Sequence, residues 1–142
     1  MSDLIAAAPW ELHPQLARDT VAIGDLSLSR ILLMNDANYP WILLVPRRPD
    51  LREIIDLDEP DRGHLLAEIT QASLALKSVV PCDKLNIAAI GNVVSQLHVH
   101  IVARLRTDAA WPKPVWGLPP RAYDPAHLKR LADALRRAFA LD

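Results

Sequence analysis

Hydrophobic and polar residues alternate from Gln96 to Arg104, and this alternation predicts a β-strand. Successive strand side chains point to opposite faces of a sheet. One face would carry Gln96, His98, His100 and Val102, and the other Leu97, Val99, Ile101 and Ala103. Residues two apart lie roughly 6.5–7 Å apart, so both imidazoles could address one phosphate-sized group.

Apolar runs bounded by turn residues predict four further strands. They are Thr20–Ile23, Leu26–Met34, Trp41–Val45 and Lys84–Ile90. Gly24 and Asp25 are expected to form the tight turn of a hairpin between the first two. Trp41–Val45 lies between prolines and is apolar throughout, which favours a buried central strand. The connection from Lys84–Ile90 to the histidine strand has hairpin length, so these two strands are expected to be antiparallel neighbours.

Two helices are predicted. Asp58 can cap the first, Pro60 suits its first turn, and Pro81 ends it. Its apolar stripe consists of Leu65, Ile69, Ala72, Leu76 and Val79, a spacing that lets the helix cover a sheet. A terminal helix within 124–142 has the stripe Leu128, Leu131, Leu135 and Phe139. Residues 1–18 are expected to form an N-terminal arm with a short helical turn near Leu16.

Residues 107–123 show neither helical nor strand periodicity and are rich in proline. The segment carries Trp111 and Trp116, large aromatic residues that are costly to expose. It is therefore expected to be either a lid on a site or a dimer contact.

The chain of 142 residues fits a single domain, 1–142, with 51% hydrophobic and 23% charged residues and a net charge of −1. This balance is typical of a soluble globular protein and argues against binding to a nucleic-acid polymer. Cys82 is the only cysteine, so a disulfide framework is excluded. The apolar run Leu4–Ala8 is too short for a signal peptide or membrane span. We therefore expect a cytoplasmic protein without membrane association.

Three interpretations of His98 and His100 compete. They could simply line a polar sheet face. They could bind a metal, but the glutamate that a cupin places shortly after such a pair is missing, and the remaining histidines, His13, His64 and His127, read as surface residues. They could instead serve nucleophilic catalysis at phosphorus, for which a neutral imidazole is suited.

The stretch from Gln96 to Val102 resembles the histidine triad signature, His-φ-His-φ-His-φ-φ with φ apolar, with Gln96 in place of the first histidine. Gly91-Asn92 resembles the Gly-Gln that precedes the motif in this family. Asn35-Asp36 and the run 41–47 resemble its ribose-contacting loop and central strand. The resemblance extends over roughly residues 23–116.

This resemblance implies an α+β fold with an antiparallel sheet of about five strands, one long covering helix and a C-terminal helix. It also implies a homodimer that acts on small nucleotides without a cofactor or metal. His98 would be the catalytic nucleophile toward the α-phosphate of a nucleoside phosphoramidate or dinucleoside polyphosphate. His100, Gln96 and Asn92 would bind phosphate. Asn35 and Asp36 would contact the nucleotide at its ribose.

Three positions depart from the family pattern. Gln96 cannot carry a proton, Val93 replaces a small hydroxyl residue, and Trp41 stands where many members have histidine. The leading hypothesis is a nucleotide hydrolase or nucleotidyl transferase that works through a nucleotidyl-histidine intermediate. The alternative is a nucleotide-binding or sensing protein with little catalysis. A metalloenzyme is the third possibility.

Overall fold

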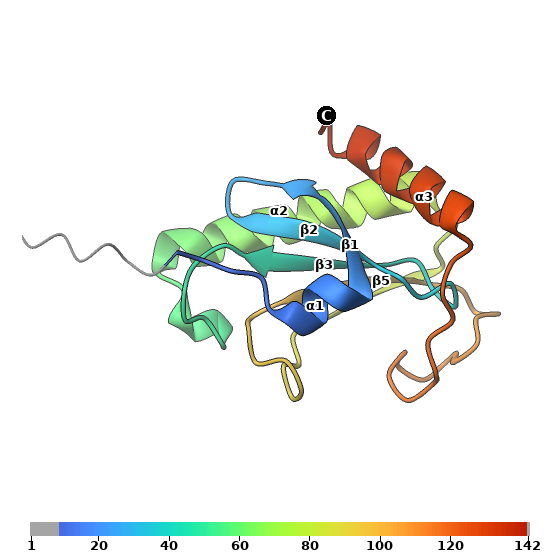
Figure 1. The fold of residues 1–142 in the computed structure, drawn as a ribbon, viewed down its shortest axis with the longest axis horizontal. Helices are drawn as coiled ribbons and strands as arrows, with labels where there is room; N and C mark the ends of the chain where they lie inside the picture. The colour runs from blue at the N-terminus through green and yellow to red at the C-terminus, as the bar shows by residue number, and fades with distance from the viewer. Residues whose placement is uncertain (1–8, 142) are drawn as a thin grey trace, which may run out of the picture.

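The computed structural model describes residues 9–141 and arranges them as one open sheet with helices on both faces (Figure 1). In chain order the elements are α1 (Pro14–Asp19), β1 (Thr20–Asp25), β2 (Ser29–Met34), β3 (Trp41–Pro46), the short 3₁₀ helix η1 (Ile54–Asp56), α2 (Glu59–Val79), β4 (Lys84–Ala88), β5 (Val99–Arg104) and α3 (Pro125–Ala138). Residues 1–8 of the expected arm, with the apolar run Leu4–Ala8, lie outside the described residues, as does Asp142.

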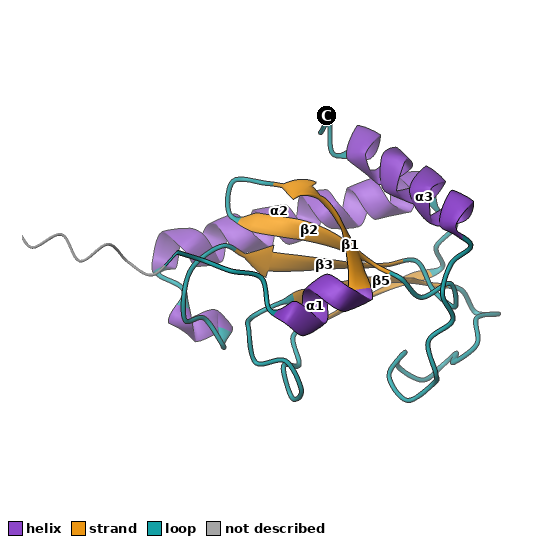
Figure 2. Cartoon of the chain, viewed as in Figure 1, coloured by secondary structure: helices purple, strands orange, loops and turns teal. Residues whose placement is uncertain are grey.

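Among residues 9–141 the sheet has five strands in the order β1-β2-β3-β5-β4, and every adjacent pair is antiparallel. Figure 2 shows the strands in orange, with the long helix α2 and the C-terminal helix α3 in purple. This confirms the predicted α+β fold and the predicted pairing of β4 with β5. In the described part of the chain, no helix is long and apolar enough to cross a membrane.

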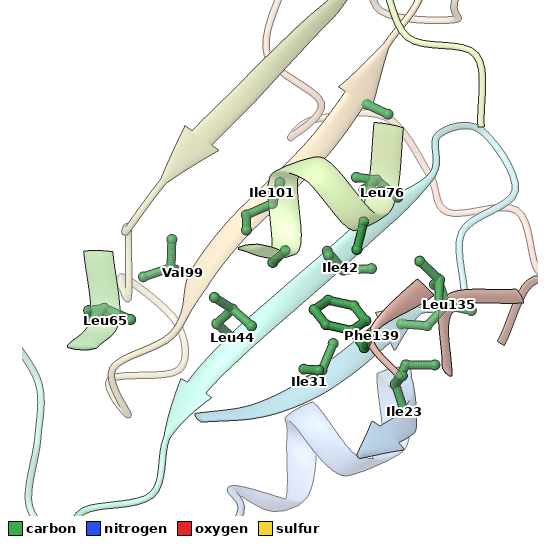
Figure 3. Packing of buried hydrophobic residues seen from close by; sticks show 14 of the residues in the cluster. Ile23, Ile31, Ile42, Leu44, Leu65, Leu76, Val99, Ile101, Leu135 and Phe139 are labelled. Atoms are coloured by element: carbon green, nitrogen blue, oxygen red, sulfur yellow. The ribbon is translucent and has the colours of Figure 1, made fainter. Parts of the chain in front are cut away.

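Both faces of the sheet are buried. In Figure 1, α2 lies behind the sheet and α1 in front of it. The larger core cluster lies under α2 and α3 (Figure 3) and includes Ile23, Ile31, Ile42, Leu44, Leu65, Leu76, Val99, Ile101, Leu135 and Phe139. The smaller cluster is made by Leu16, Leu32, Tyr39, Trp41, Leu43, Val45, Val94, Val102 and Val115. All six residues of β3 are buried, as expected for a central strand.

Helix α2 has the predicted limits because its ends are capped locally. The Asp58 carboxylate accepts from the main-chain N–H of Asp61 at 2.8 Å, and Pro60 occupies the first turn. The helix ends at Val79, just before Pro81. The predicted stripe contacts the larger cluster, with Leu65, Ala72 and Leu76 buried and Ile69 and Val79 packed against it.

The predicted turn at Gly24 and Asp25 is wrong, since both residues belong to β1. The register of β1 shifts between Ala22 and Gly24, and Asp25 then pairs with Arg30 of β2. Their side chains form an ion pair at 2.8 Å that favours this longer pairing. The turn is made instead by residues 26–28, and β2 begins only at Ser29.

Strand β5 is also shorter than predicted. Residues 96–98 precede it, and the N–H of Leu97 donates to the carbonyl oxygen of Leu51 at 2.9 Å, outside the sheet. The strand begins at Val99, where pairing with Leu44 of β3 starts. His98 and His100 therefore lie at the start of β5, where the backbone enters the sheet.

A buried carboxylate ties α2 to the β1–β2 turn. Glu68 is 6% exposed, and its two oxygens accept from the N–H groups of Leu28 and Ser29 at 2.9 and 3.0 Å. Glu68→Ala leaves both donors without partners, so it should lower the free energy of unfolding by about 3 kcal/mol. Urea denaturation would measure this loss. Gln71→Ala, on the exposed side of the same helix, should change stability little, and equal stability of the two variants would contradict the assignment.

Candidate active site

Two imidazoles lie side by side where β5 begins. His98 is the residue before the strand, and His100 is the second residue within it. Their ring centroids are 4.8 Å apart, with the planes at 70°. Pairing sets His100 opposite Leu43 of β3, on the sheet face that carries the smaller cluster. Both imidazoles are buried, each residue being 6% exposed.

Hydrogen bonds define which ring nitrogen carries the proton. Nδ1 of His98 lies 2.6 Å from the carbonyl oxygen of Gln96. A carbonyl oxygen only accepts, so this Nδ1 carries the hydrogen and Nε2 of neutral His98 keeps its lone pair. His100 has the opposite arrangement, because its Nδ1 accepts from the indole N–H of Trp41 at 3.0 Å. One ring thus offers a lone pair at Nε2, and the other offers an N–H.

His100 stays uncharged at neutral pH. Burial lowers its pKa to about 3, and the neighbouring His98 lowers it as well, because a second positive charge so close would be repelled. Protonation at Nδ1 would also break the bond from Trp41. His100 is therefore a neutral hydrogen-bond donor.

A cavity of about 540 Å³ opens in front of the two rings, a volume within the usual range for small-molecule sites. The structure brings five of the six predicted site residues to its wall, namely Asn35, Asp36, Asn92, His98 and His100. The cavity is also lined by Trp41 and by residues of α1. The lining residues come from four separate parts of the chain, within 15–19, 34–41, 90–100 and 115–120, which only the fold brings together.

Asn35 and Asp36 reach the cavity wall from the loop after β2. Asp36 is 4% exposed, and its Oδ1 accepts from the N–H groups of Asn38 and Arg121 at 3.0 and 3.2 Å. Oδ1 of Asn35 accepts from the N–H of Tyr123 at 2.9 Å. The two side chains therefore hold this loop against the end of the irregular segment.

Gln96 is the predicted site residue that does not line this cavity. Its Oε1 accepts from the N–H of His13 at 2.9 Å, and its Nε2 donates to the carbonyl oxygen of Glu11 at 2.8 Å. Both polar ends of the amide are thus bonded to the segment before α1. A second cavity, of about 310 Å³, lies between Gln96 and η1 and also borders His98.

Asn92 and Val93 lie in the loop between β4 and β5. Asn92 is exposed at the cavity rim, and Val93 is 93% exposed. The preceding Gly91 has φ +69°, a left-handed conformation that glycine adopts without strain. The loop lines the cavity together with the two histidines.

The two tryptophans of segment 107–123 have different surroundings. The Trp116 ring lies 5.0 Å from His100 and 5.8 Å from Trp41, between centroids, and lines the cavity. Trp111 instead packs against the guanidinium of Arg104, 5.5 Å from its ring centroid. Trp116 accordingly covers the site, as a lid residue would.

Sequence reasoning missed the contribution of α1. Gln15, Arg18 and Asp19 line the cavity and are bonded to each other, with Gln15 Nε2 donating to both carboxylate oxygens of Asp19 and Arg18 donating to Gln15 Oε1 at 2.7 Å. A six-residue helix inside a proline-containing arm has no periodic signal long enough to reveal this role.

The remaining histidines are not gathered at the site. His13 accepts from the N–H of Gln15 as the cap of α1, His64 lies 3.4 Å from Asp61 on α2, and the ring of His127 packs against Tyr123. In residues 9–141 no group of three His, Cys, Asp or Glu side chains is placed to hold a metal ion.

The fold and the paired imidazoles define a class of α+β proteins in which a His-x-His pair at the start of a strand faces a cavity. A family model described as HIT domain matches residues 15–107. A histidine triad protein from Bradyrhizobium japonicum is 57% identical, over 93% of this chain and 99% of that one, with a TM-score of 0.91. One from Marinobacter aquaeolei VT8 is 39% identical, over 94% and 98%, with a TM-score of 0.90. No protein with a curated description matches the sequence.

The chain belongs to the histidine triad (HIT) family. A third solved structure, a histidine triad protein from Sinorhizobium meliloti 1021, is 37% identical, over 91% of this chain and 96% of that one, with a TM-score of 0.88. HIT proteins are generally nucleotide hydrolases. Membership therefore supports a nucleotide-binding or nucleotide hydrolase/transferase role.

Proposed function

We propose that this protein is a nucleotide hydrolase or nucleotidyl transferase acting on an α-phosphate, with His98 as the nucleophile. The observation that carries the proposal is the pair of opposite tautomers beside one cavity. Because Nδ1 of His98 is bonded to the carbonyl oxygen of Gln96, Nε2 is the nitrogen with a lone pair for attack. His100 offers an N–H that can bond a phosphate oxygen.

The reaction proceeds in two displacements. The lone pair of His98 Nε2 forms a bond to the α-phosphorus, and the bond from phosphorus to the leaving group breaks with its electron pair going to that group. Water then attacks the phosphorus, the proton that water releases balances the one that the leaving group takes up, and the P–N bond breaks to return the lone pair to His98. Charge on the phosphate oxygens is met by N–H donors, so the scheme calls for no cofactor or metal.

The other predicted residues take supporting roles. Asn92 reaches the phosphate from the cavity rim, and Asn35 and Asp36 contact the ribose. The main-chain carbonyl of Gln96 orients the nucleophile. A direct phosphate contact from the Gln96 side chain would require its amide to leave Glu11 and His13. Nucleoside phosphoramidates and dinucleoside polyphosphates are the proposed substrates.

We further propose one domain that works as a cytoplasmic homodimer on small nucleotides. The two core clusters on the faces of a single sheet support one domain. Exposed apolar side chains at and near the edge strand β4, Ile87 and Ile90, support a contact with a second copy. The free Cys82 suits a reducing compartment.

A nucleotide-binding or sensing protein with little catalysis is the second candidate. It is favoured by the Gln96 amide, which is engaged by the N-terminal segment and cannot carry a proton. Val93, at the place of a hydroxyl residue, removes another phosphate donor.

A trapped intermediate distinguishes the two candidates. The protein is mixed with adenosine phosphoramidate or diadenosine polyphosphate, quenched rapidly, and its intact mass is measured. We expect a mass increase of one nucleotidyl group, mapped to His98 by peptide sequencing. Repeating the reaction after exhaustive chelation tests the metal-independent scheme. Tight nucleotide binding without adduct or product would favour the sensing protein instead.

A further inference from the structure

Trp41 stands beside His100 because of the sheet register. It is the first residue of β3 and pairs with Val102 of β5, while His100 pairs with Leu43 two residues further along β3. The two side chains are therefore diagonal neighbours on one sheet face, a separation that large aromatic residues can bridge. Their ring centroids are 5.6 Å apart.

The contact between them is directional. Trp41 Nε1 lies 3.0 Å from Nδ1 of His100, and both residues are more than nine-tenths buried. An indole nitrogen only donates, and its hydrogen does not titrate in water. The bond can form only while Nδ1 of His100 keeps its lone pair, so the imidazole proton must be on Nε2.

The indole itself is held by its neighbours. Tyr39 and Trp116 contact it edge-on, with centroids 6.5 and 5.8 Å away, and Trp41 is 7% exposed. Trp116 also touches the His100 ring, at 5.0 Å, but the interaction is between ring faces and edges, and no hydrogen bond joins them. Trp41 is therefore the neighbour that determines which ring nitrogen of His100 carries the proton.

We propose that Trp41 is a positioning residue that fixes His100 in the tautomer with its proton on Nε2, so that the ring serves as a permanent, uncharged hydrogen-bond donor to the substrate phosphate. The tautomer assignment rests on the structure alone, and its use toward phosphate rests on the proposed function. A tryptophan at this position makes the donor independent of pH. The two imidazoles thereby have different roles, because the carbonyl oxygen of Gln96 holds His98 in the opposite tautomer, with its lone pair on Nε2.

Histidine-selective ¹⁵N labelling and two-bond ¹H–¹⁵N correlation spectra would read the tautomer directly. The wild-type protein should show His100 with a protonated Nε2 and a bare Nδ1, unchanged from mildly acidic to mildly alkaline pH. Trp41→Phe keeps an aromatic ring and removes the donor, so His100 should populate the other tautomer and titrate at a higher pH than in the wild type. Trp116→Phe makes the same indole-to-phenyl change at the other tryptophan beside His100, which does not bond to Nδ1, and should leave the tautomer unchanged.

Kinetics supply a second measurement that a packing role would not reproduce. Trp41→Phe should lower kcat/KM about tenfold at neutral pH, the effect of losing one hydrogen bond to the reacting group. The deficit should shrink as pH falls, because protonation of His100 restores the hydrogen on Nε2.

A wild-type spectrum with the His100 proton on Nδ1 would overturn the proposal even if the variant fails to fold. An unchanged tautomer in folded Trp41→Phe would overturn it as well. If the tautomer shifts as expected but the wild-type protein forms no adduct on His98, the role of Trp41 in fixing the His100 tautomer is supported and the proposed hydrolase function is contradicted. The two results thus distinguish the inference from the function on which its second half rests.

Discussion

Replacement of His98 by alanine is expected to lower turnover of a nucleoside phosphoramidate roughly a thousandfold or more, the usual effect of deleting a covalent nucleophile. Nucleotide binding should persist, because Asn35, Asp36 and His100 remain at the cavity wall. Steady-state assays with purified variants would measure the loss, and isothermal titration with a nucleoside monophosphate would measure binding.

Two controls sharpen this result. His127→Ala removes an imidazole from the surface of α3 and should leave turnover unchanged. Added imidazole should restore part of the activity of His98→Ala, because the site opens to a cavity that can admit the free ring. A His98→Ala variant with wild-type kcat would show that the reaction uses another nucleophile.

Replacement of Asp108 by alanine is expected to lower the free energy of unfolding by about 3–5 kcal/mol, the usual cost of leaving a buried charge without its partner. The Asp108 carboxylate accepts hydrogen bonds from Nε and Nη2 of Arg104, at 2.7 and 2.9 Å. The side chains are 1% exposed for Arg104 and 6% for Asp108. The same carboxylate accepts from the N–H of Trp111 at 2.9 Å, so the turn that follows β5 loses its support too.

The pH dependence of this contribution has a definite sign. Burial opposes ionisation of Asp108, but the Arg104 guanidinium and the backbone N–H groups outweigh it, so its pKa is lowered. The stabilisation is therefore complete when the pH is above the ordinary pKa of aspartate, and it is lost as the pH falls through the lowered pKa of Asp108 in the folded protein. Urea denaturation at neutral and acidic pH would measure this trend.

Asp133→Ala is the matched control for Asp108→Ala. Asp133 also faces two cations, Lys129 and Arg136, but at a partly exposed position on α3 where solvent screens the charges, so its loss should cost much less stability than the loss of Asp108. The double variant Arg104→Met with Asp108→Leu should recover part of the stability, because no buried charge is left unpaired. Similar losses for Asp108→Ala and Asp133→Ala would contradict the assignment.

Local patterns were sufficient to predict the strand that carries His100, its neighbour β4 and the long helix α2. The alternation around His98 and His100 and the stripe on α2 depend on residues a few positions apart, and the structure confirms the pairing of β4 with β5 and the cover that α2 gives the sheet. The predicted turn at Gly24 and Asp25 was wrong because β1 continues through both residues, and Asp25 pairs with Arg30 of β2 and forms an ion pair with it.

Local sequence patterns could not predict the hydrogen bonds of Trp41 and Gln96 at the candidate site. Trp41 and His100 are 59 positions apart, and Gln96 lies 83 and 85 positions from its partners His13 and Glu11. Such bonds depend on how strands and the N-terminal segment come together. The sequence marked Trp41 and Gln96 as unusual for the family, but it contained no information on the atoms they face.

Gln96 forms hydrogen bonds through both its side-chain amide and its main-chain carbonyl, and this changes how mutations at this position should be interpreted. Its amide bonds to the segment before α1, and its carbonyl oxygen bonds to the ring of His98, the proposed nucleophile, so one residue contacts both. Gln96→His would restore the first histidine of the family signature. It would also remove the amide bonds to Glu11 and His13, which precede a helix that lines the cavity. A loss of activity in that variant would report on the attachment of the N-terminal segment, and the consensus sequence would be the less active one.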